Sequence, residues 1–296
     1  MPSNQPKIPW RRKAARLTII ALTAYAVACV FLAHSYLHPR RDTSMVRPIS
    51  IKEVSIPSAK GPVPTWVTTR LAEGKGKPVV FVMAYGLGGN RGYWTDAMLQ
   101  LSKRGYECVA PSMPGQDASP DDSVGFGIKE AAMVVDAVQW ARSQYKKPPK
   151  VILWGLSMGG AAVWLASEKD PTVDAVVSEG AYSQFDEAMN NWLNRKLPGS
   201  SFYLRPMIWL ASWEAGIDPA KIIPRNSAAK WTKPGLVVQG AEDKLIPRHQ
   251  AEDLSAAARC PLWLVPGAAH AECFPVAEKE FLDRLTALAR KVQSNR

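Results

Sequence analysis

The stretch Val151-Ile152-Leu153-Trp154-Gly155-Leu156-Ser157-Met158-Gly159-Gly160 decides the fold of this chain. The uninterrupted apolar run 151–154 predicts a strand that is buried on both faces of a sheet. A helix is expected to begin near Ser157, so Gly-x-Ser-x-Gly lies between a strand and a helix, as in a tight turn that lifts a serine hydroxyl above the sheet edge. Glycines leave room for that strained turn. Ser157 is therefore predicted to be a nucleophile, although a serine here can also act only as a helix N-cap.

Strand-like and helix-like segments alternate on both sides of this stretch. The helices are expected at 93–103, around 132–140 and from 278 to about 291. The other strand-like segments are 51–56, 65–71, 79–83, 108–110, 173–177, 236–238 and 262–265. This alternation predicts an α/β fold whose mainly parallel sheet carries helices on both faces. Residues 48–296 are read as one domain, and residues 182–231, which break the alternation, as a lid inserted between two core strands.

A serine hydroxyl attacks a carbonyl group poorly unless a base accepts its proton, so a nucleophilic Ser157 requires a histidine. Of the four histidines, His34 and His38 flank an apolar N-terminal segment, and His249 is expected at the exposed start of a helix. His270 follows the last predicted strand, on a loop at the sheet edge. We therefore predict that His270 is the base.

The acid that would orient this histidine is predicted to be Asp243. It lies on the loop after the strand that precedes the His270 strand. Ser157, Asp243 and His270 then follow the chain order Ser, Asp, His. An aspartate at this point can also be a turn residue, and Glu242 and Glu179 are the alternative acids.

The acyl oxygen that becomes negative during such an attack needs hydrogen-bond donors. The loop Met83-Ala84-Tyr85-Gly86-Leu87-Gly88-Gly89-Asn90 follows a central strand and can bring backbone N–H groups close to a ligand. The backbone amides of Leu87 and Met158 are the predicted oxyanion hole. The loop has neither the Lys-Ser/Thr of a P-loop nor a G-x-G-x-x-G pattern, so nucleotide binding is only weakly supported.

The loop 85–90, the stretch 155–160 and the segments 240–247 and 266–270 together resemble the landmarks of the α/β-hydrolase superfamily. The chain is similar in particular to membrane-anchored or secreted esterase/lipase-like members, including monoacylglycerol-lipase-like and serine-aminopeptidase-like relatives. The resemblance covers roughly residues 48–296. It implies an eight-stranded, mostly parallel sheet, a lid after the sixth strand, and no cofactor or metal. The chain departs from the family pattern at Tyr85, where histidine is usual, and at Gln239, where His-Gly is common.

The lid is unusually rich in large apolar side chains: Phe185, Trp192, Leu193, Phe202, Tyr203, Leu204, Ile208, Trp209, Leu210 and Trp213. Most of them are expected to form the contact between the lid and the core. The remaining few can line an apolar acyl pocket, because small-molecule sites have mostly apolar walls. Tyr85, Trp192, Trp209 and Trp213 are the predicted substrate-binding residues.

The N-terminus is predicted to direct the chain to a membrane. Residues 1–16 carry five cations, residues 17–33 carry no charge, and a span of 17–36 is long enough to cross a bilayer; residues 37–47 form a stem. More cations precede the span than follow it, which favours a cytoplasmic N-terminus and an extracytoplasmic domain. The alternative is a signal peptide cleaved near Ala26 or Ala28, with secretion of the domain, and a lipoprotein cleavage box before Cys29 is less favoured. A retained anchor is preferred because the apolar run continues past these sites.

The net charge of +11 first suggests an acidic partner, but residues 1–47 account for +7 of it. The remaining 249 residues have no basic run, so a nucleic-acid partner is not expected. Four cysteines show no metal-ligand spacing, and Cys260 and Cys273 bracket a predicted strand, which argues against a disulfide bond between them.

Together these features predict a serine hydrolase that cleaves carboxylic esters with an apolar acyl group, through an acyl-enzyme and without a cofactor. The substrate is expected to be a small-molecule ester or a lipid-like ester. The alternatives are a peptidase or amidase of the same fold, and a non-catalytic, membrane-tethered binding protein, because a fold alone does not establish an activity.

Overall fold

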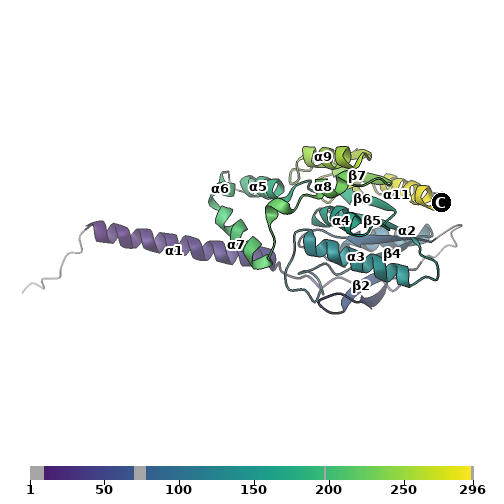
Figure 1. Cartoon of the computed structure of the whole chain (residues 1–296), viewed down its shortest axis with the longest axis horizontal. Coiled ribbons are helices and arrows are strands. Elements are labelled where there is room, and N and C mark those ends of the chain that lie inside the picture. Colours follow the sequence, from purple (N-terminus) through teal and green to yellow (C-terminus); the bar gives the residue numbers. More distant parts are fainter. Residues whose placement is uncertain (1–9, 70–77, 197, 295–296) are drawn as a thin grey trace, which may run out of the picture.

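A computed structural model of the chain describes residues 10–69, 78–196 and 198–294. Its centre is an eight-stranded sheet with the strand order β1-β2-β4-β3-β5-β6-β7-β8 (Figure 1). The strands are β1 (Lys52–Ile56), β2 (Val63–Thr68), β3 (Val79–Ala84), β4 (Glu107–Pro111), β5 (Lys150–Leu156), β6 (Ala175–Glu179), β7 (Gly235–Gly240) and β8 (Leu262–Val265). Strand β2 pairs antiparallel with β1 and β4, and all other neighbours are parallel. The predicted α/β fold with a mostly parallel sheet is confirmed.

Helices cover the sheet and leave no face of its central strands open. The helices of the described residues, including those that do not lie on the sheet, are α1 (Trp10–Leu37), α2 (Thr95–Lys103), α3 (Ile128–Ser143), α4 (Met158–Lys169), α5 (Phe185–Lys196), α6 (Ser200–Tyr203), α7 (Arg205–Ala215), α8 (Pro224–Ala229), α9 (Arg248–Ala258), α10 (Cys273–Val276) and α11 (Glu278–Ser294), with short 3₁₀ turns η1 (Arg91–Trp94) and η2 (Pro219–Lys221). Every residue of β3 is buried. Trp154 of β5 packs against Trp94 of η1 and Phe281 of α11. The continuous apolar runs thus form strands that are enclosed on both sides.

The second and sixth strands are shifted along the chain from their predicted ranges. The sixth strand, expected at 173–177, begins two residues later, because the Asp170 carboxylate accepts a hydrogen bond from the backbone N–H of Thr172 at 2.9 Å and closes a turn there. The second strand, expected at 65–71, is β2, and residues 70 and 71 lie outside the described part of the chain. The expected helix at 93–103 begins as the 3₁₀ turn η1 and continues as α2.

The lid predicted at 182–231 corresponds to the helical insertion between β6 and β7, formed by α5, α6, α7, η2 and α8. Part of the insertion packs in a second apolar cluster, apart from the main core. This cluster also includes Met158 at the start of α4 and Cys29, Ala33 and Leu37 of α1. The insertion is therefore held from two sides, by the start of α4 and by the N-terminal helix.

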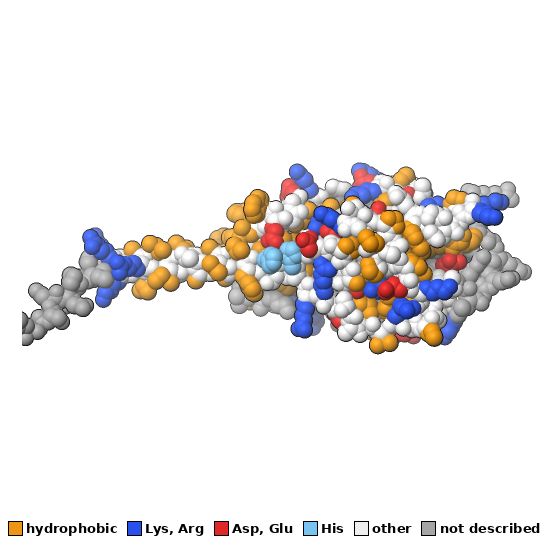
Figure 2. Space-filling model, turned by 90° about the horizontal axis from the view of Figure 1, so that it is seen from below, with side chains coloured by type: hydrophobic (Ala, Val, Ile, Leu, Met, Phe, Trp, Pro, Cys, Tyr) orange, Lys and Arg blue, Asp and Glu red, His pale blue; other side chains and the backbone are white. Residues whose placement is uncertain are grey.

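Helix α1 projects from the domain, with apolar side chains along its length and a group of cations at its far end (Figures 1 and 2). It begins at Trp10, so the cations from Arg11 to Arg16 lie in its first turns, and residues 1–9 of the predicted basic segment lie outside the described residues. Its 28 residues span about 42 Å at 1.5 Å per residue. By length and composition, α1 can cross a membrane or serve as a signal sequence.

Candidate functional site

Ser157 lies on a strained turn between β5 and α4. Its backbone has φ 54° and ψ −118°, a conformation that side-chain-bearing residues rarely adopt. The turn is possible because Gly155 and Gly159 lack side chains: a Cβ at Gly155 would lie 2.1 Å from the carbonyl oxygen of Gly159, and one at Gly159 would lie 2.0 Å from that of Ala84. Ser157 occupies the N-cap position of α4, but its hydroxyl makes no capping hydrogen bond. The N-cap alternative therefore does not explain the direction of this side chain.

The structure brings Ser157, His270 and Asp243 together. The Oγ atom of Ser157 lies 3.0 Å from Nε2 of His270, and Nδ1 of His270 lies 2.7 Å from Oδ2 of Asp243. The Asp243 side chain is 1% exposed, and the His270 side chain is 19% exposed. The parallel register explains this convergence, because the carboxyl ends of β5, β7 and β8 meet at the same sheet edge.

Asp243 is fixed by donors on both carboxylate oxygens. Its Oδ1 accepts the backbone N–H groups of Leu245 at 2.8 Å and Ile246 at 3.0 Å. The side-chain amide of Gln239 donates to Oδ2 at 2.9 Å and to the carbonyl oxygen of Ile246 at 3.0 Å. Gln239, one of the two departures from the family pattern, therefore orients the acid, a role that sequence reasoning missed.

The two alternative acids do not contact His270 in this way. Glu242 is exposed, and its backbone N–H donates to the carbonyl oxygen of Ala268 at 2.9 Å. Glu179 is fully buried, and burial raises the pKa of its carboxyl group to about 7, although Trp154, Cys273 and the nearby His270 partly oppose this shift. Its backbone carbonyl accepts the N–H of Ser157 at 2.8 Å. Glu179 thus supports the turn through its main chain.

The two predicted oxyanion donors lie next to Ser157. Met158 is the first residue of α4, where backbone N–H groups have no partner within the helix. Leu87 belongs to the loop that passes over Ser157: a Cβ on the preceding Gly86 would lie 3.0 Å from the Ser157 Cβ. Gln116 accepts a hydrogen bond from the N–H of Gly88 and holds this loop. Two backbone N–H groups can therefore approach a ligand oxygen beside the Ser157 hydroxyl.

An apolar cavity of about 230 Å³ opens beside Ser157 and His270. It is lined by Tyr36, Leu87, Phe126, Met158, Tyr182, Phe185, Ala188, Met189, Trp192, Leu245 and Ile246. A second, more polar cavity of about 560 Å³ lies between Trp192 and His270, with Arg195, Lys244 and Glu242 in its wall. Ser157 and His270 line the apolar cavity, and His270 also lines the polar cavity. A ligand with an apolar part in one cavity and a polar part in the other would therefore pass beside them.

The predicted substrate-binding residues separate into two groups. Trp192 lines both cavities, and Tyr85 lines a smaller one with Gly86 and Leu87, while its hydroxyl accepts the backbone N–H of Met113 at 2.6 Å. Trp209 and Trp213 do not belong to the wall beside Ser157. They are 66% and 83% exposed, because α7 turns Met207, Ile208 and Ala211 inward and these two tryptophans, one turn apart, outward.

Sequence reasoning missed several aromatic residues of the apolar cavity, among them Tyr36 and Phe126. Tyr36 is in the last turn of α1 and stacks against Phe126 at a ring distance of 5.4 Å. It also lies 5.2 Å from the Trp192 ring. Tyr36 is the last residue of the predicted membrane span. No local pattern in the sequence indicates that its side chain lies in a cavity of the domain. The side chains of His34, His38 and Glu214 converge as metal ligands do. They do not line the apolar cavity.

Comparisons with known proteins agree with this fold. A family model described as alpha/beta hydrolase fold matches residues 79–203. An esterase from Pyrococcus furiosus has a similar structure, with a TM-score of 0.71 and 17% identity over 88% of this chain and 99% of the esterase. The alpha/beta hydrolase GrgF from Penicillium sp. matches with a TM-score of 0.63 and 16% identity over 82% of this chain and 99% of its own.

A peptidase shares the same architecture. The acylaminoacyl peptidase from Pyrococcus horikoshii matches with a TM-score of 0.63 and 14% identity, over 85% of this chain and 43% of the peptidase. No curated protein matches the chain in sequence. At these identities, the similar structures establish the fold and leave the chemistry to be argued from the site.

Proposed function

We propose that this chain, which has the alpha/beta hydrolase fold, is a serine hydrolase that cleaves carboxylic esters with an apolar acyl group. The observation that carries the proposal is the hydrogen-bonded series Ser157, His270 and Asp243 at the edge of an apolar cavity. Nucleophile, base and orienting acid are within hydrogen-bond reach of one another, as covalent catalysis requires.

The reaction follows from these contacts. Ser157 Oγ attacks the acyl carbon while Nε2 of His270 takes the hydroxyl proton, and buried Asp243 stabilises the imidazolium. The N–H groups of Leu87 and Met158 donate to the oxyanion, and the dipole of α4 favours negative charge at its N-terminus. His270 gives its proton to the leaving alcohol. Water then loses a proton to His270, attacks the acyl-enzyme, and releases the acid with a restored Ser157 hydroxyl.

Each half of the ester occupies one of the two cavities. The apolar cavity takes the acyl group, and the polar cavity with Arg195 and Lys244 takes the leaving group. A volume of about 230 Å³ lies below the range of about 300–1,000 Å³ usual for small-molecule sites, so short to medium acyl chains fit best.

The protein acts at a membrane, with α1 as a retained anchor and the catalytic domain on the extracytoplasmic side. Apolar side chains from Leu17 to Phe31 are exposed along α1, which supports contact with lipid. The lid lies beside the same helix. Helix α7 packs along α1, and the Tyr25 hydroxyl donates to the carbonyl oxygen of Tyr203. If α1 spans the bilayer, the outer face of α7 reaches the same lipid layer.

The proposal is tested with the purified full chain, a fluorophosphonate probe, and p-nitrophenyl esters of rising acyl length. Wild type is expected to be labelled and to prefer short to medium chains. Ser157→Ala is expected to lose labelling and to lower kcat by about 10⁴-fold or more, because no other group replaces the nucleophile. Ser143→Ala, which changes an exposed serine of α3, is the matched control and should behave as wild type.

Two outcomes would contradict this assignment. Absence of labelling in a folded wild-type protein, or equal turnover by Ser157→Ala, would exclude a Ser157 nucleophile and favour a non-catalytic binding protein. Faster cleavage of an anilide than of the ester with the same acyl group would identify an amidase or peptidase instead.

A further inference from the structure

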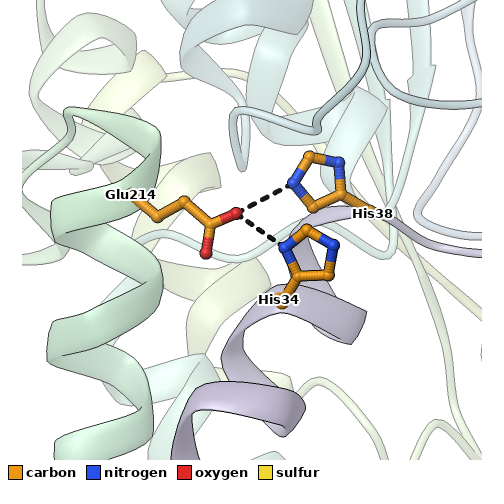
Figure 3. A group of neighbouring side chains, drawn as sticks. All are labelled: His34, His38 and Glu214. Carbon is orange, nitrogen blue, oxygen red and sulfur yellow. Dashed lines mark hydrogen bonds and ion pairs between the residues drawn. The ribbon is translucent and has the colours of Figure 1, made fainter.

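Three side chains converge where the N-terminal helix meets the lid (Figure 3). His34 lies in the last turn of α1, His38 follows the end of that helix, and Glu214 lies near the end of α7. Nδ1 of His34 and Nε2 of His38 lie 2.9 Å and 3.0 Å from the same carboxylate oxygen, Oε1 of Glu214. The three atoms all lie within 4.8 Å of one another. Two nitrogens and one oxygen from separate elements thus point at one position.

The backbone holds the two imidazoles side by side. The N–H of His38 donates to the carbonyl oxygen of His34 at 2.9 Å, so the helical turn continues one residue past Leu37. The ring centroids are 4.2 Å apart. Histidines at i and i+4 of a helix present their nitrogens on one face, which is the spacing that zinc-binding helices use.

Both ring nitrogens of His38 face oxygen acceptors, and a neutral imidazole can donate a hydrogen bond to only one of them. Its Nδ1 lies 2.6 Å from the backbone carbonyl oxygen of Asp122, and its Nε2 faces the Glu214 carboxylate. Both partners only accept hydrogen bonds, whereas a neutral imidazole has a single N–H. If Nδ1 donates to Asp122, the lone pair of Nε2 points at a carboxylate oxygen. A cation between them, either a second proton or a metal ion, removes this repulsion.

We propose that His34 Nδ1, His38 Nε2 and Glu214 Oε1 form a binding site for a divalent transition metal of the Zn²⁺ class. Two histidines and a glutamate are a known zinc ligand set, completed by water. With bonds of about 2.0–2.2 Å, tetrahedral ligand atoms lie about 3.3 Å apart, so the 2.9 Å and 3.0 Å separations need to open by a few tenths of an ångström. The carbonyl of Asp122 fixes the tautomer that leaves His38 Nε2 free to bind metal.

The position of the site gives the metal a structural role. It would join the end of α1 to the end of α7, two elements that are more than 170 residues apart in the chain. Tyr36 lies between the two histidines in sequence and lines the apolar cavity. The metal would therefore fasten the lid to the helix that supplies one wall of this cavity.

The site is tested on the full chain, purified in detergent micelles without a histidine tag and stripped with a chelator. Isothermal titration with Zn²⁺ is expected to show one ion per chain with a Kd of about 1 µM or tighter. Co²⁺ at the same site is expected to give a visible absorption band. His34→Ala, His38→Ala and Glu214→Gln should each weaken binding at least 10-fold, about the smallest loss that even supporting residues of metal sites cause.

Two variants separate ligation from folding. Glu214→His supplies a nitrogen donor and is expected to restore tight binding that Glu214→Gln loses. His249→Ala removes the other exposed His–Glu contact, 2.6 Å to Glu187, and should bind as wild type. No saturable binding below about 100 µM would overturn the proposal. Equal binding by all three ligand variants, or an equal loss in His249→Ala, would also overturn it.

Discussion

At the residue scale, the site contains one buried acid that the reaction does not use. Glu179 ends β6, next to the strained turn at Ser157, and its carboxyl group is fully buried near Trp154 and Cys273. Burial raises its pKa to about 7, from an ordinary value of 4.5, because the charged form loses its hydration. The folded protein therefore holds a proton on Glu179 at a pH where the unfolded chain has released it.

This difference makes stability depend on pH. Because the folded pKa is raised, stability falls as pH rises from 4.5 to about 7, and it stays low at higher pH. Glu179→Gln cannot ionise, so its free energy of unfolding should exceed that of wild type by up to about 3 kcal/mol at pH 8 and differ little at pH 4.5. Denaturant titrations at both pH values measure this. Exposed Glu242→Gln is the control, and a Glu179→Gln effect equal at the two pH values would contradict the prediction.

At the element scale, α7 has two apolar faces instead of one. Its inner face packs in the second apolar cluster, while Trp209 and Trp213 lie on the outer face and are largely exposed. Phe202 and Tyr203 of α6 are exposed as well, and they adjoin the stretch of α1 that contains Tyr25. Tryptophan and tyrosine are favoured at the interface between lipid and water. The outer face of the lid therefore continues the apolar surface of α1.

We expect the double variant Trp209→Ser/Trp213→Ser to act normally on a water-soluble ester and several-fold more slowly on an ester embedded in phosphatidylcholine vesicles. The reason is that the lid loses its contact with lipid while the residues around Ser157 are unchanged. Val276→Ser is the control, since it alters an exposed apolar residue of α10, which packs against α11. A parallel loss on both substrates would mean that the tryptophans act on the active site itself.

The sequence could predict elements and residues that depend on local signals. Ser157, Asp243 and His270 each follow an apolar strand, and parallel strands bring their carboxyl ends to one edge. The direction of Trp209 could not be predicted, because α7 is apolar nearly all round and its burial depends on which neighbour takes which face. The contact between Gln239 and Asp243 could not be predicted either, because the shape of the loop that carries Asp243 decides which side chains reach its carboxylate.

At the scale of the whole molecule, the N-terminal helix is part of the packed structure. Cys29, Ala33 and Leu37 are buried, and the carbonyl oxygen of Leu37 accepts the N–H of Val124 at 2.9 Å. Farther along, Arg41 donates to the carbonyl oxygen of Ser119 at 2.6 Å. Helix α1 and the α/β domain are thus joined by side-chain packing as well as by the chain itself.

Two truncations separate the anchoring role of α1 from its packing role. Removal of residues 1–24 takes away about half of the exposed apolar residues of α1 and leaves a helix too short to span a bilayer, so it should abolish membrane association while leaving Tm nearly unchanged. Removal of residues 1–38 also deletes Leu37 and its buried neighbours and should lower Tm by about 5 °C or more, since one buried leucine contributes about 1.5–3 kcal/mol. Thermal unfolding measures both. Equal Tm values for the two truncations would show that the end of α1 does not stabilise the domain.

If α1 is a membrane anchor and the apolar cavity takes the substrate, Tyr36 belongs to both the anchor and the substrate pocket. A tether joined to its enzyme by a free linker can be exchanged by recombination without effect on catalysis. Here a replacement for α1 must keep an aromatic residue at the position of Tyr36, because this side chain forms part of the wall of the apolar cavity. On the proposed function, moving this domain to another membrane would therefore require a new anchor that also completes the apolar cavity.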